Sequence, residues 1–166
     1  MRRTLAVLIA ASFAAAAPAK GRAEEPRERA RERPSTDARR DDAVRKAVAA
    51  VLERQTAAWN RGDLEDFVSV YAEDATFVSP TGLTRGRQAV LDRYRKRYPD
   101  KAAMGTLSLE VLEDRIARGA GGRVQAASVV ARWTLAYPDK PAASGLTLLV
   151  LHPRGAGWAI VQDASM

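Results

Sequence analysis

Asp163 is the carboxylate in this sequence that is best placed for chemistry. It follows Ile160 and Val161 in a stretch that has the pattern of a β-strand. Burial in such a strand raises the pKa of a carboxyl group and would make Asp163 suited to act as a general base. Alternatively, Asp163 pairs with a basic neighbour such as Arg132 and has a structural role, which is the more common arrangement for a buried carboxylate.

The sequence has few residues whose type and spacing could bind a metal ion or form an activated nucleophile. The sequence has one histidine, His152, and no cysteine, so the usual histidine and cysteine sites for zinc cannot form. His152 stands beside Pro153 at a predicted strand end, where we expect it to face solvent or to make a structural hydrogen bond. No glycine-rich phosphate loop, nucleophile elbow or pair of carboxylates at catalytic spacing occurs. We therefore predict no metal site and no cofactor.

Aromatic residues on the apolar faces of several predicted elements are suited to line a pocket. Their rings provide apolar surface, and tyrosine hydroxyls can orient a ligand. The candidate ligand-binding residues are Trp59, Tyr71, Phe77, Tyr94, Tyr98 and Trp133, together with Arg132. The same rings would also serve an ordinary core, so we expect only some of them to touch a ligand.

A run of basic residues surrounds two of these tyrosines. Such a run can meet an acidic ligand or a phosphate. Tyr94 and Tyr98 take the inward side at helical spacing, however, which favours a solvated outer face for the basic side chains. The run consists of Arg93, Arg95, Lys96, Arg97 and Lys101, with Arg85 and Arg87 nearby.

The elements that must position these residues change character near the middle of the chain. Helical periodicity predicts helices over residues 44–59, 64–71 and 87–98, with Gly62 as a C-cap and Asp63 as an N-cap. Alternating patterns then predict strands over residues 107–111, 129–137, 146–152 and 158–163, after a short strand at 75–79. The order of elements predicts an α+β fold, in which three N-terminal helices pack on one side of a strongly curved antiparallel sheet.

Several stretches carry a resemblance to a known superfamily. They are residues 57–64 (AAWNRGDL), 71–77 (YAEDATF), 80–82 (PTG) with Gly86-Arg87, and 157–163 (GWAIVQD). In order and spacing they resemble the nuclear transport factor 2-like superfamily, which includes ketosteroid isomerases and polyketide-cyclase-like proteins. The resemblance implies a cystatin-like cone, in which helices close a bent sheet over an apolar pocket and the outer face of the sheet forms a homodimer.

The resemblance does not extend to the catalytic residues of ketosteroid isomerases. Gln55 stands where those enzymes have a tyrosine, Ser79 replaces their acid–base aspartate, and Leu149 replaces their protonated aspartate. A serine without a neighbouring base cannot move a proton between carbons at neutral pH, and leucine donates no hydrogen bond. We therefore exclude steroid isomerase chemistry.

Three functions remain open after this exclusion. We expect a binding domain, non-enzymatic or weakly catalytic, whose pocket holds a small apolar or aromatic molecule. The alternative is an isomerase, cyclase or hydrolase that uses Asp163 with Tyr94 or Arg132. The third is a dimeric protein-interaction module.

The N-terminal region predicts export. A positive start, Met1-Arg2-Arg3, precedes an apolar run over residues 5–17 and an exit rich in small residues, which is typical of a signal peptide over residues 1–23. The run is shorter than the ~20 residues of a membrane helix, so we expect no stable membrane span after cleavage, and a secreted or periplasmic location. Residues 24–40 have almost no apolar side chain and predict a charged disordered linker, which leaves the domain to residues 41–166.

The net charge of +7 and the isoelectric point near 10.2 suggest a nucleic-acid-binding protein until the charges are placed along the chain. Residues 1–40 hold 10 of the 27 basic and 5 of the 20 acidic residues, which leaves a net charge of +2 for residues 41–166. Specific nucleic-acid binding needs positive charge concentrated on a domain face. We therefore predict no specific nucleic-acid partner.

Overall fold

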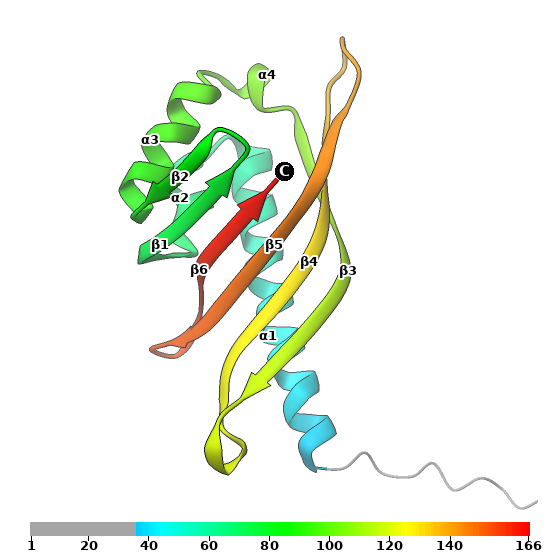
Figure 1. The fold of residues 1–166 in the computed structure, drawn as a ribbon. Coiled ribbons are helices and arrows are strands. Elements are labelled where there is room, and N and C mark those ends of the chain that lie inside the picture. Colours follow the sequence, from blue (N-terminus) through cyan, green and yellow to red (C-terminus); the bar gives the residue numbers. More distant parts are fainter. Residues whose placement is uncertain (1–35) are drawn as a thin grey trace, which may run out of the picture. The chain divides into compact units, whose positions relative to one another are not determined.

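The computed structural model describes residues 36–166 (Figure 1). The predicted signal peptide and residues 24–35 of the predicted linker lie outside the described residues. Helix α1 (Thr36–Arg61) begins ahead of the domain boundary expected at Asp41. Residues 36–40 are helical because they add turns to an amphipathic helix that is already formed, with Asp37 in the favourable first turn.

Three further α-helices follow α1, of which the last was not predicted, and the two predicted caps, Gly62 and Asp63, are confirmed. Gly62 adopts φ +81°, and its N–H donates to the carbonyl of Trp59 over 2.8 Å, which ends α1. Asp63 caps α2 (Leu64–Ser69) by accepting a hydrogen bond from the Asp66 N–H over 2.8 Å. Helices α3 (Arg87–Arg97) and α4 (Lys101–Met104) complete the set.

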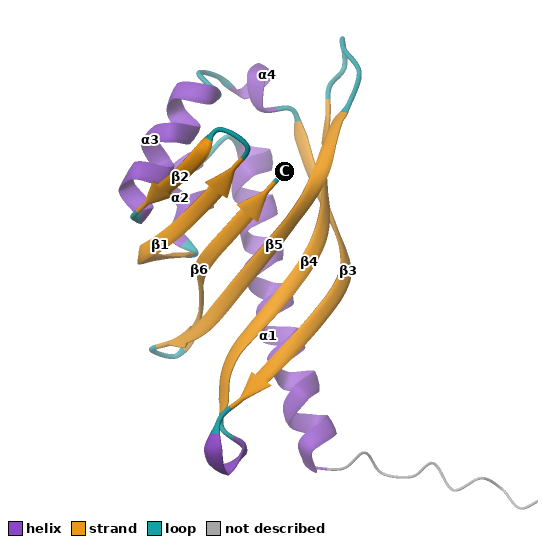
Figure 2. Cartoon of the chain, viewed as in Figure 1, coloured by secondary structure: helices purple, strands orange, loops and turns teal. Residues whose placement is uncertain are grey.

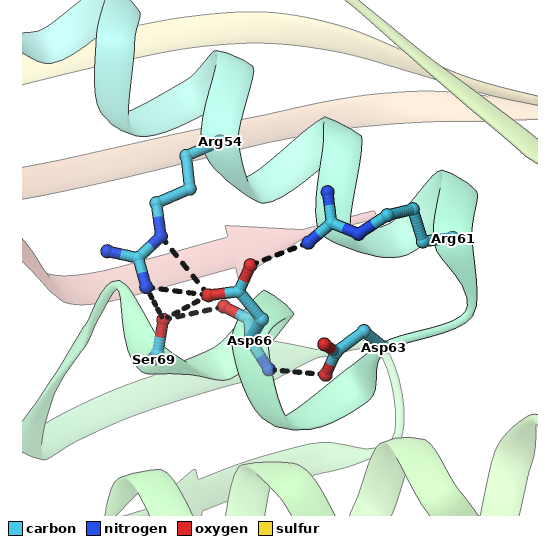
Figure 3. Close-up of polar contacts among 5 residues, drawn as sticks. All are labelled: Arg54, Arg61, Asp63, Asp66 and Ser69. Atoms are coloured by element: carbon cyan, nitrogen blue, oxygen red, sulfur yellow. Dashed lines mark hydrogen bonds and ion pairs between the residues drawn. The ribbon is translucent and has the colours of Figure 1, made fainter.

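Helices α1 and α2 are joined by an ion-pair cluster around Asp66 (Figure 3). One Asp66 carboxylate oxygen accepts from Arg54 Nε and Nη2 over 3.1 and 2.6 Å, and the other accepts from Arg61 Nη2 over 2.8 Å. The Ser69 hydroxyl also lies 3.2 Å from Asp66 Oδ1. The cluster holds the short second helix against the long first one.

Six strands form one mixed sheet in the order β2-β1-β6-β5-β4-β3. Their bounds are β1 (Tyr71–Ser79), β2 (Gly82–Arg85), β3 (Thr106–Arg118), β4 (Val124–Ala136), β5 (Ala143–Arg154) and β6 (Gly157–Ser165). Four of the neighbouring pairs are antiparallel, and β1 runs parallel to β6. The α+β fold with N-terminal helices on a sheet is confirmed, and the parallel pair makes the sheet mixed.

Tyr71 was expected on the second helix but begins β1 instead. Helix α2 already ends at Ser69, and Tyr71 pairs with Ile160 of β6. The Ile160 N–H donates to the carbonyl of Val70 over 2.9 Å, which draws the chain into the sheet directly after the helix. Strand β1 is therefore longer than the predicted strand at 75–79, and it brings the Tyr71 ring under the helices.

The core lies between the sheet and helices α1, α2 and α3 (Figures 1 and 2). Helix α1 crosses one face of the sheet behind β3 and β4 in this view, while the opposite face of those strands carries no helix from residues 36–166. The side chains of Val48, Leu52 and Trp59 on α1 are buried against this core, as their spacing predicts. Within residues 36–166, none of the helices combines the length and hydropathy that a membrane crossing needs.

Candidate ligand-binding cavity

A cavity of about 730 Å³ lies between the helices and the concave side of the sheet. Side chains from α1, α2, α3 and every strand except β2 contribute to its wall. Most of the wall is apolar, with Trp59, Phe67, Phe77, Leu107, Leu109, Trp133, Leu135 and Leu149 as its aromatic and aliphatic members. The volume falls in the range of about 300–1,000 Å³ that small-molecule sites occupy.

The structure places the predicted aromatic residues together. Each of the six rings named from the sequence lines the cavity, and so does Asp163. The rings pack edge to face: the Trp59 ring centroid lies 5.1 Å from that of Phe67 and 4.8 Å from that of Tyr98. Phe67 of the second helix, an aromatic residue also expected near the pocket, lines the cavity with them.

Arg132 was expected in this site but lies on the other face of the sheet. It is exposed, and its Nε lies 3.5 Å from a carboxylate oxygen of Glu110. Successive side chains of a strand point to opposite faces, so an inward Trp133 requires an outward Arg132. The expected pairing of Asp163 with Arg132 is wrong for the same reason.

Asp163 instead accepts hydrogen bonds from three hydroxyl groups. The Tyr71 hydroxyl donates to Oδ2 over 2.6 Å, while Thr147 Oγ1 and Ser165 Oγ donate to Oδ1 over 2.8 and 2.7 Å. The residue is only 4% exposed. We call Asp163, Tyr71, Thr147 and Ser165 the hydroxyl cluster.

Burial sets the electrostatics of the hydroxyl cluster. It raises the pKa of Asp163 above the ordinary value, because desolvation outweighs the three hydrogen bonds that favour the carboxylate. The pKa values of Tyr71 and Tyr94 are raised well above 10 by burial, and the nearby charge of Asp163 adds to both shifts. The two tyrosines therefore remain protonated donors at neutral pH, and Asp163 is the group in the cluster that can gain or lose a proton.

The three positions that lack the ketosteroid isomerase residues have different places in the structure. Gln55 and Leu149 line the cavity, whereas Ser79 accepts a hydrogen bond from Arg93 Nη2 over 2.8 Å. Leu149 pairs directly with Asp163 across the β5–β6 ladder. The cavity thus holds a carboxyl group one strand away from Leu149.

Sequence reasoning missed several polar residues of the wall. Arg93, Lys96 and Arg97 line the cavity, although the basic run was expected to form a solvated outer face. Their spacing of three and four residues places them on one side of α3, and this spacing was the available signal. Thr147 and Ser165 gave no signal, because hydroxyl residues are common in strands; the bond from Thr147 joins β5 to β6, whereas Ser165 and Asp163 lie two residues apart on β6.

Both indole N–H groups in the wall are buried without a hydrogen-bond partner among the described residues. Trp133 lies close to the backbone of Gly145, where an added Cβ would come within 2.6 Å of Trp133 Cζ2. Gly145 is therefore required for this position of the indole. Within residues 36–166, no group of three or more histidine, aspartate or glutamate side chains is arranged to hold a metal ion, and His152 is exposed at its strand end.

Comparison with protein families matches residues 52–162 to the SnoaL-like domain. This match spans the C-terminal part of α1, most of the cavity wall and β6 as far as Gln162, and it ends just before Asp163. A comparison with curated proteins finds no significant match.

Solved structures show the same fold. A nuclear transport factor 2-like protein of unknown function from Shewanella oneidensis shares 30% identity, with a TM-score of 0.63 over 73% of this chain and 97% of its own. A ketosteroid isomerase-like protein from Erwinia carotovora atroseptica is 16% identical, with a TM-score of 0.55 over 72% and 92% of the two chains. ActVI-ORFA from Streptomyces coelicolor is 14% identical, with a TM-score of 0.58 over 75% and 96%.

Proposed function

Because the chain belongs to the SnoaL-like domain family of the nuclear transport factor 2-like superfamily, we propose that it binds a small apolar or aromatic molecule in the cavity. The observation that carries this proposal is the wall itself, which is built mainly of aromatic and aliphatic side chains around about 730 Å³. An apolar molecule that enters such a cavity is removed from water, which stabilises the complex. The few polar groups of the wall then fix its orientation.

Binding of the neutral fluorophore N-phenyl-1-naphthylamine tests this proposal. We expect saturable binding to the full chain, and loss of binding in Leu149→Trp, because the larger side chain fills the space that Leu149 borders. Leu112→Trp is the matched control, since Leu112 is 45% exposed and lies outside the cavity. Equal binding by wild type and Leu149→Trp would refute the proposal. Native mass spectrometry of protein purified from its own host would identify a molecule that the cavity retains.

Acid–base catalysis by Asp163 is a second candidate function. It is favoured by one observation: the carboxyl group is 4% exposed at the cavity wall, and its pKa is raised by that burial. Tyr94, which also lines the cavity, would donate a hydrogen bond to the reacting molecule. To test this, the molecule that mass spectrometry identifies is incubated with wild type and, separately, with Asp163→Asn. Chromatography should show conversion by wild type alone if the protein is an enzyme, and no conversion by either if it only binds.

Export is a further part of the proposal. It is supported by the basic start and the apolar run of residues 1–23. We expect protein recovered from the periplasm or the medium to begin near Lys20 or Glu24, as measured by N-terminal sequencing. Recovery of the full-length chain from the cytoplasm alone would contradict export.

We also propose that the outer face of the sheet forms a homodimer. Leu146 and Leu148 alternate with the inward residues of β5 and are 40% and 42% exposed on that outer face. Light scattering after size exclusion should give twice the chain mass for wild type and the chain mass for Leu148→Arg, because a charge at the interface is costly to bury. A monomeric wild type would refute the dimer and, with it, the dimeric interaction module.

A further inference from the structure

We propose that the molecule held in the cavity is an organic acid with an apolar or aromatic body. Its anionic group would lie against Arg93, Lys96 and Arg97 on α3, and its body would occupy the apolar interior. This inference deepens the proposed function and rests on it. It names the chemical class of the ligand, whereas the apolar wall alone specifies only hydrophobicity.

The three cations share one part of the cavity wall. They occupy positions that are three and four residues apart on α3, so they lie on one side of the helix. Arg93 is half-buried, while Lys96 and Arg97 are exposed, which locates them where the cavity opens to solvent. An anionic group at this opening keeps part of its hydration while the rest of the molecule is buried.

The positive charges at the opening are not neutralised by the protein. None of the three side chains forms an ion pair with another residue of the described part of the chain. Arg95 on the same helix differs, because it pairs with Glu65 and lies outside the cavity. Arg87 pairs with Glu73 and also lies outside the cavity, so the unpaired cations of α3 line the cavity and its ion-paired cations do not.

Two of the guanidinium groups are held in position by neutral partners. Arg93 Nη2 donates to the hydroxyls of Ser79 and Thr81, each over 2.8 Å, and its Cζ lies 5.4 Å from the centroid of the Phe77 ring. Arg97 Cζ lies 5.8 Å from the centroid of the Tyr98 ring. These contacts orient the cations without cancelling their charge, which suits the binding of a carboxylate, sulfonate or phosphate group.

The one acidic residue of the wall cannot replace an external anion. Asp163 has its carboxylate oxygens occupied by three hydroxyl donors of the hydroxyl cluster. It forms no ion pair with Lys96 or Arg97 and is buried, whereas those two cations are exposed. An acid that enters body first keeps its anionic group at the opening and its uncharged end near Asp163, which avoids repulsion between two negative charges.

A matched pair of fluorophores tests the inference. 8-Anilinonaphthalene-1-sulfonate and N-phenyl-1-naphthylamine share one aromatic skeleton and differ in the sulfonate group. We expect the double substitution Lys96→Gln with Arg97→Gln to weaken sulfonate binding by about threefold to tenfold, as for two exposed ion pairs. Binding of the neutral probe should change by less than about twofold, and the difference should disappear in about 1 M salt, where the Debye length is about 3 Å.

Arg95→Gln is the matched control, because it removes one charge from the same helix outside the cavity. It should leave the binding of both probes within about twofold of wild type, since an exposed charge outside the site is screened. If it weakens sulfonate binding as much as the double substitution does, the effect comes from overall charge and the inference is wrong.

Two further outcomes separate the inference from the proposed function. If the double variant loses affinity equally for both probes, or for neither, the cavity binds apolar molecules without selecting acids, and the inference alone fails. If folded wild type binds neither probe, the proposed function fails and the inference fails with it. Circular dichroism of each variant establishes that the fold is retained.

Discussion

Two carboxylates in this protein, Asp66 and Asp163, each accept several side-chain hydrogen bonds, yet their pKa values shift in opposite directions. Asp66 lies near the surface between Arg54 and Arg61, and the charged donors lower its pKa. Asp163 lies in the cavity wall among neutral hydroxyls, and burial raises its pKa despite their hydrogen bonds. The nature of the donor and the access of water decide the direction of the shift.

The difference separates a structural site from one that can carry chemistry. At Asp66 the ion pairs hold two helices together, and the carboxylate is stabilised in its charged form (Figure 3). At Asp163 the hydroxyls hold the carboxyl group in place but leave its charged form without a cationic partner. A number of hydrogen bonds is therefore a poor guide to reactivity, whereas the charge of the partners is a good one.

The largest expected effect comes from disrupting the aromatic cluster in the wall of the cavity that Asp163 also lines. Trp59 is 3% exposed and packs against Phe67 and Tyr98. Trp59→Ala should lower the free energy of unfolding by about 3–5 kcal/mol, because apolar contacts are lost and a void remains. Urea denaturation measures the change. A loss below about 1 kcal/mol, close to that of a surface substitution, would show that the aromatic cluster does not define this region.

Removing one donor from Asp163 should have a smaller effect. Tyr71→Phe keeps the ring and deletes the hydroxyl that donates to Asp163 over 2.6 Å. We expect a loss of about 1–3 kcal/mol at neutral pH, because a buried carboxylate loses a hydrogen bond. Tyr137→Phe is the control, since the Tyr137 hydroxyl makes no hydrogen bond with the described residues, and it should change stability by less than about 0.5 kcal/mol. Equal losses in both variants would contradict the role of the Tyr71 hydroxyl.

Removing the charge at Asp66 should matter less again. Asp66→Asn weakens the bonds to Arg54 and Arg61 at a site where water already screens the charges. We expect a smaller loss of stability than in Tyr71→Phe, and one that shrinks in about 1 M salt. Thermal unfolding of both variants at several salt concentrations measures these losses. The loss in Tyr71→Phe should show almost no dependence on salt, because the hydrogen bond that it removes is buried. A stability loss that depends strongly on salt in Tyr71→Phe, but not in Asp66→Asn, would contradict the contrast between the two carboxylates.

The smallest expected effect is a difference between Asp66→Asn and Asp163→Asn in how the free energy of unfolding changes with pH. The lowered pKa of Asp66 stabilises the fold above the pKa of the unfolded chain, and this contribution is lost as pH falls through the folded value. The raised pKa of Asp163 stabilises the fold below the unfolded value, and this contribution is lost as pH rises through the folded value. Relative to wild type, Asp66→Asn should therefore become less stable as pH rises toward 3.8, and Asp163→Asn should become more stable as pH rises above 3.8. Urea denaturation at several pH values measures the free energy of unfolding of each variant relative to wild type. If this difference changes with pH in the same direction for both variants, one of the two pKa directions is wrong.

Much of the fold was accessible from the sequence because periodicity and caps are local properties. The stripe from Val44 to Trp59 predicted the buried face of α1, and Asp63 predicted the start of α2. The start of β1 at Tyr71 was not accessible, because it depends on pairing with Ile160, far along the chain. From the local sequence alone, Tyr71 could continue the second helix or begin a strand, and only its pairing with Ile160 decides between the two.

The candidate site was accessible in its rings but not in its hydrogen bonds. Apolar spacing located Trp59, Tyr94 and Trp133, since burial of large rings follows from the faces of their elements. The partners of Asp163 come from β1, β5 and β6, and no sequence pattern brings these strands together. Strand alternation would have excluded Arg132 once Trp133 was placed in the cavity.

The position of β6 has a consequence for how the chain acquires this structure. Strand β6 lies between β1 and β5 and joins a two-stranded half of the sheet to a three-stranded half. Because β6 follows all the other described strands in the chain, it can join the two halves only after they have been made. Their union requires contacts between distant parts of the sequence, which is typical of slow folding. Asp163 and Ser165 lie on β6 itself, so the hydroxyl cluster is complete only once β6 has paired with β1 and β5.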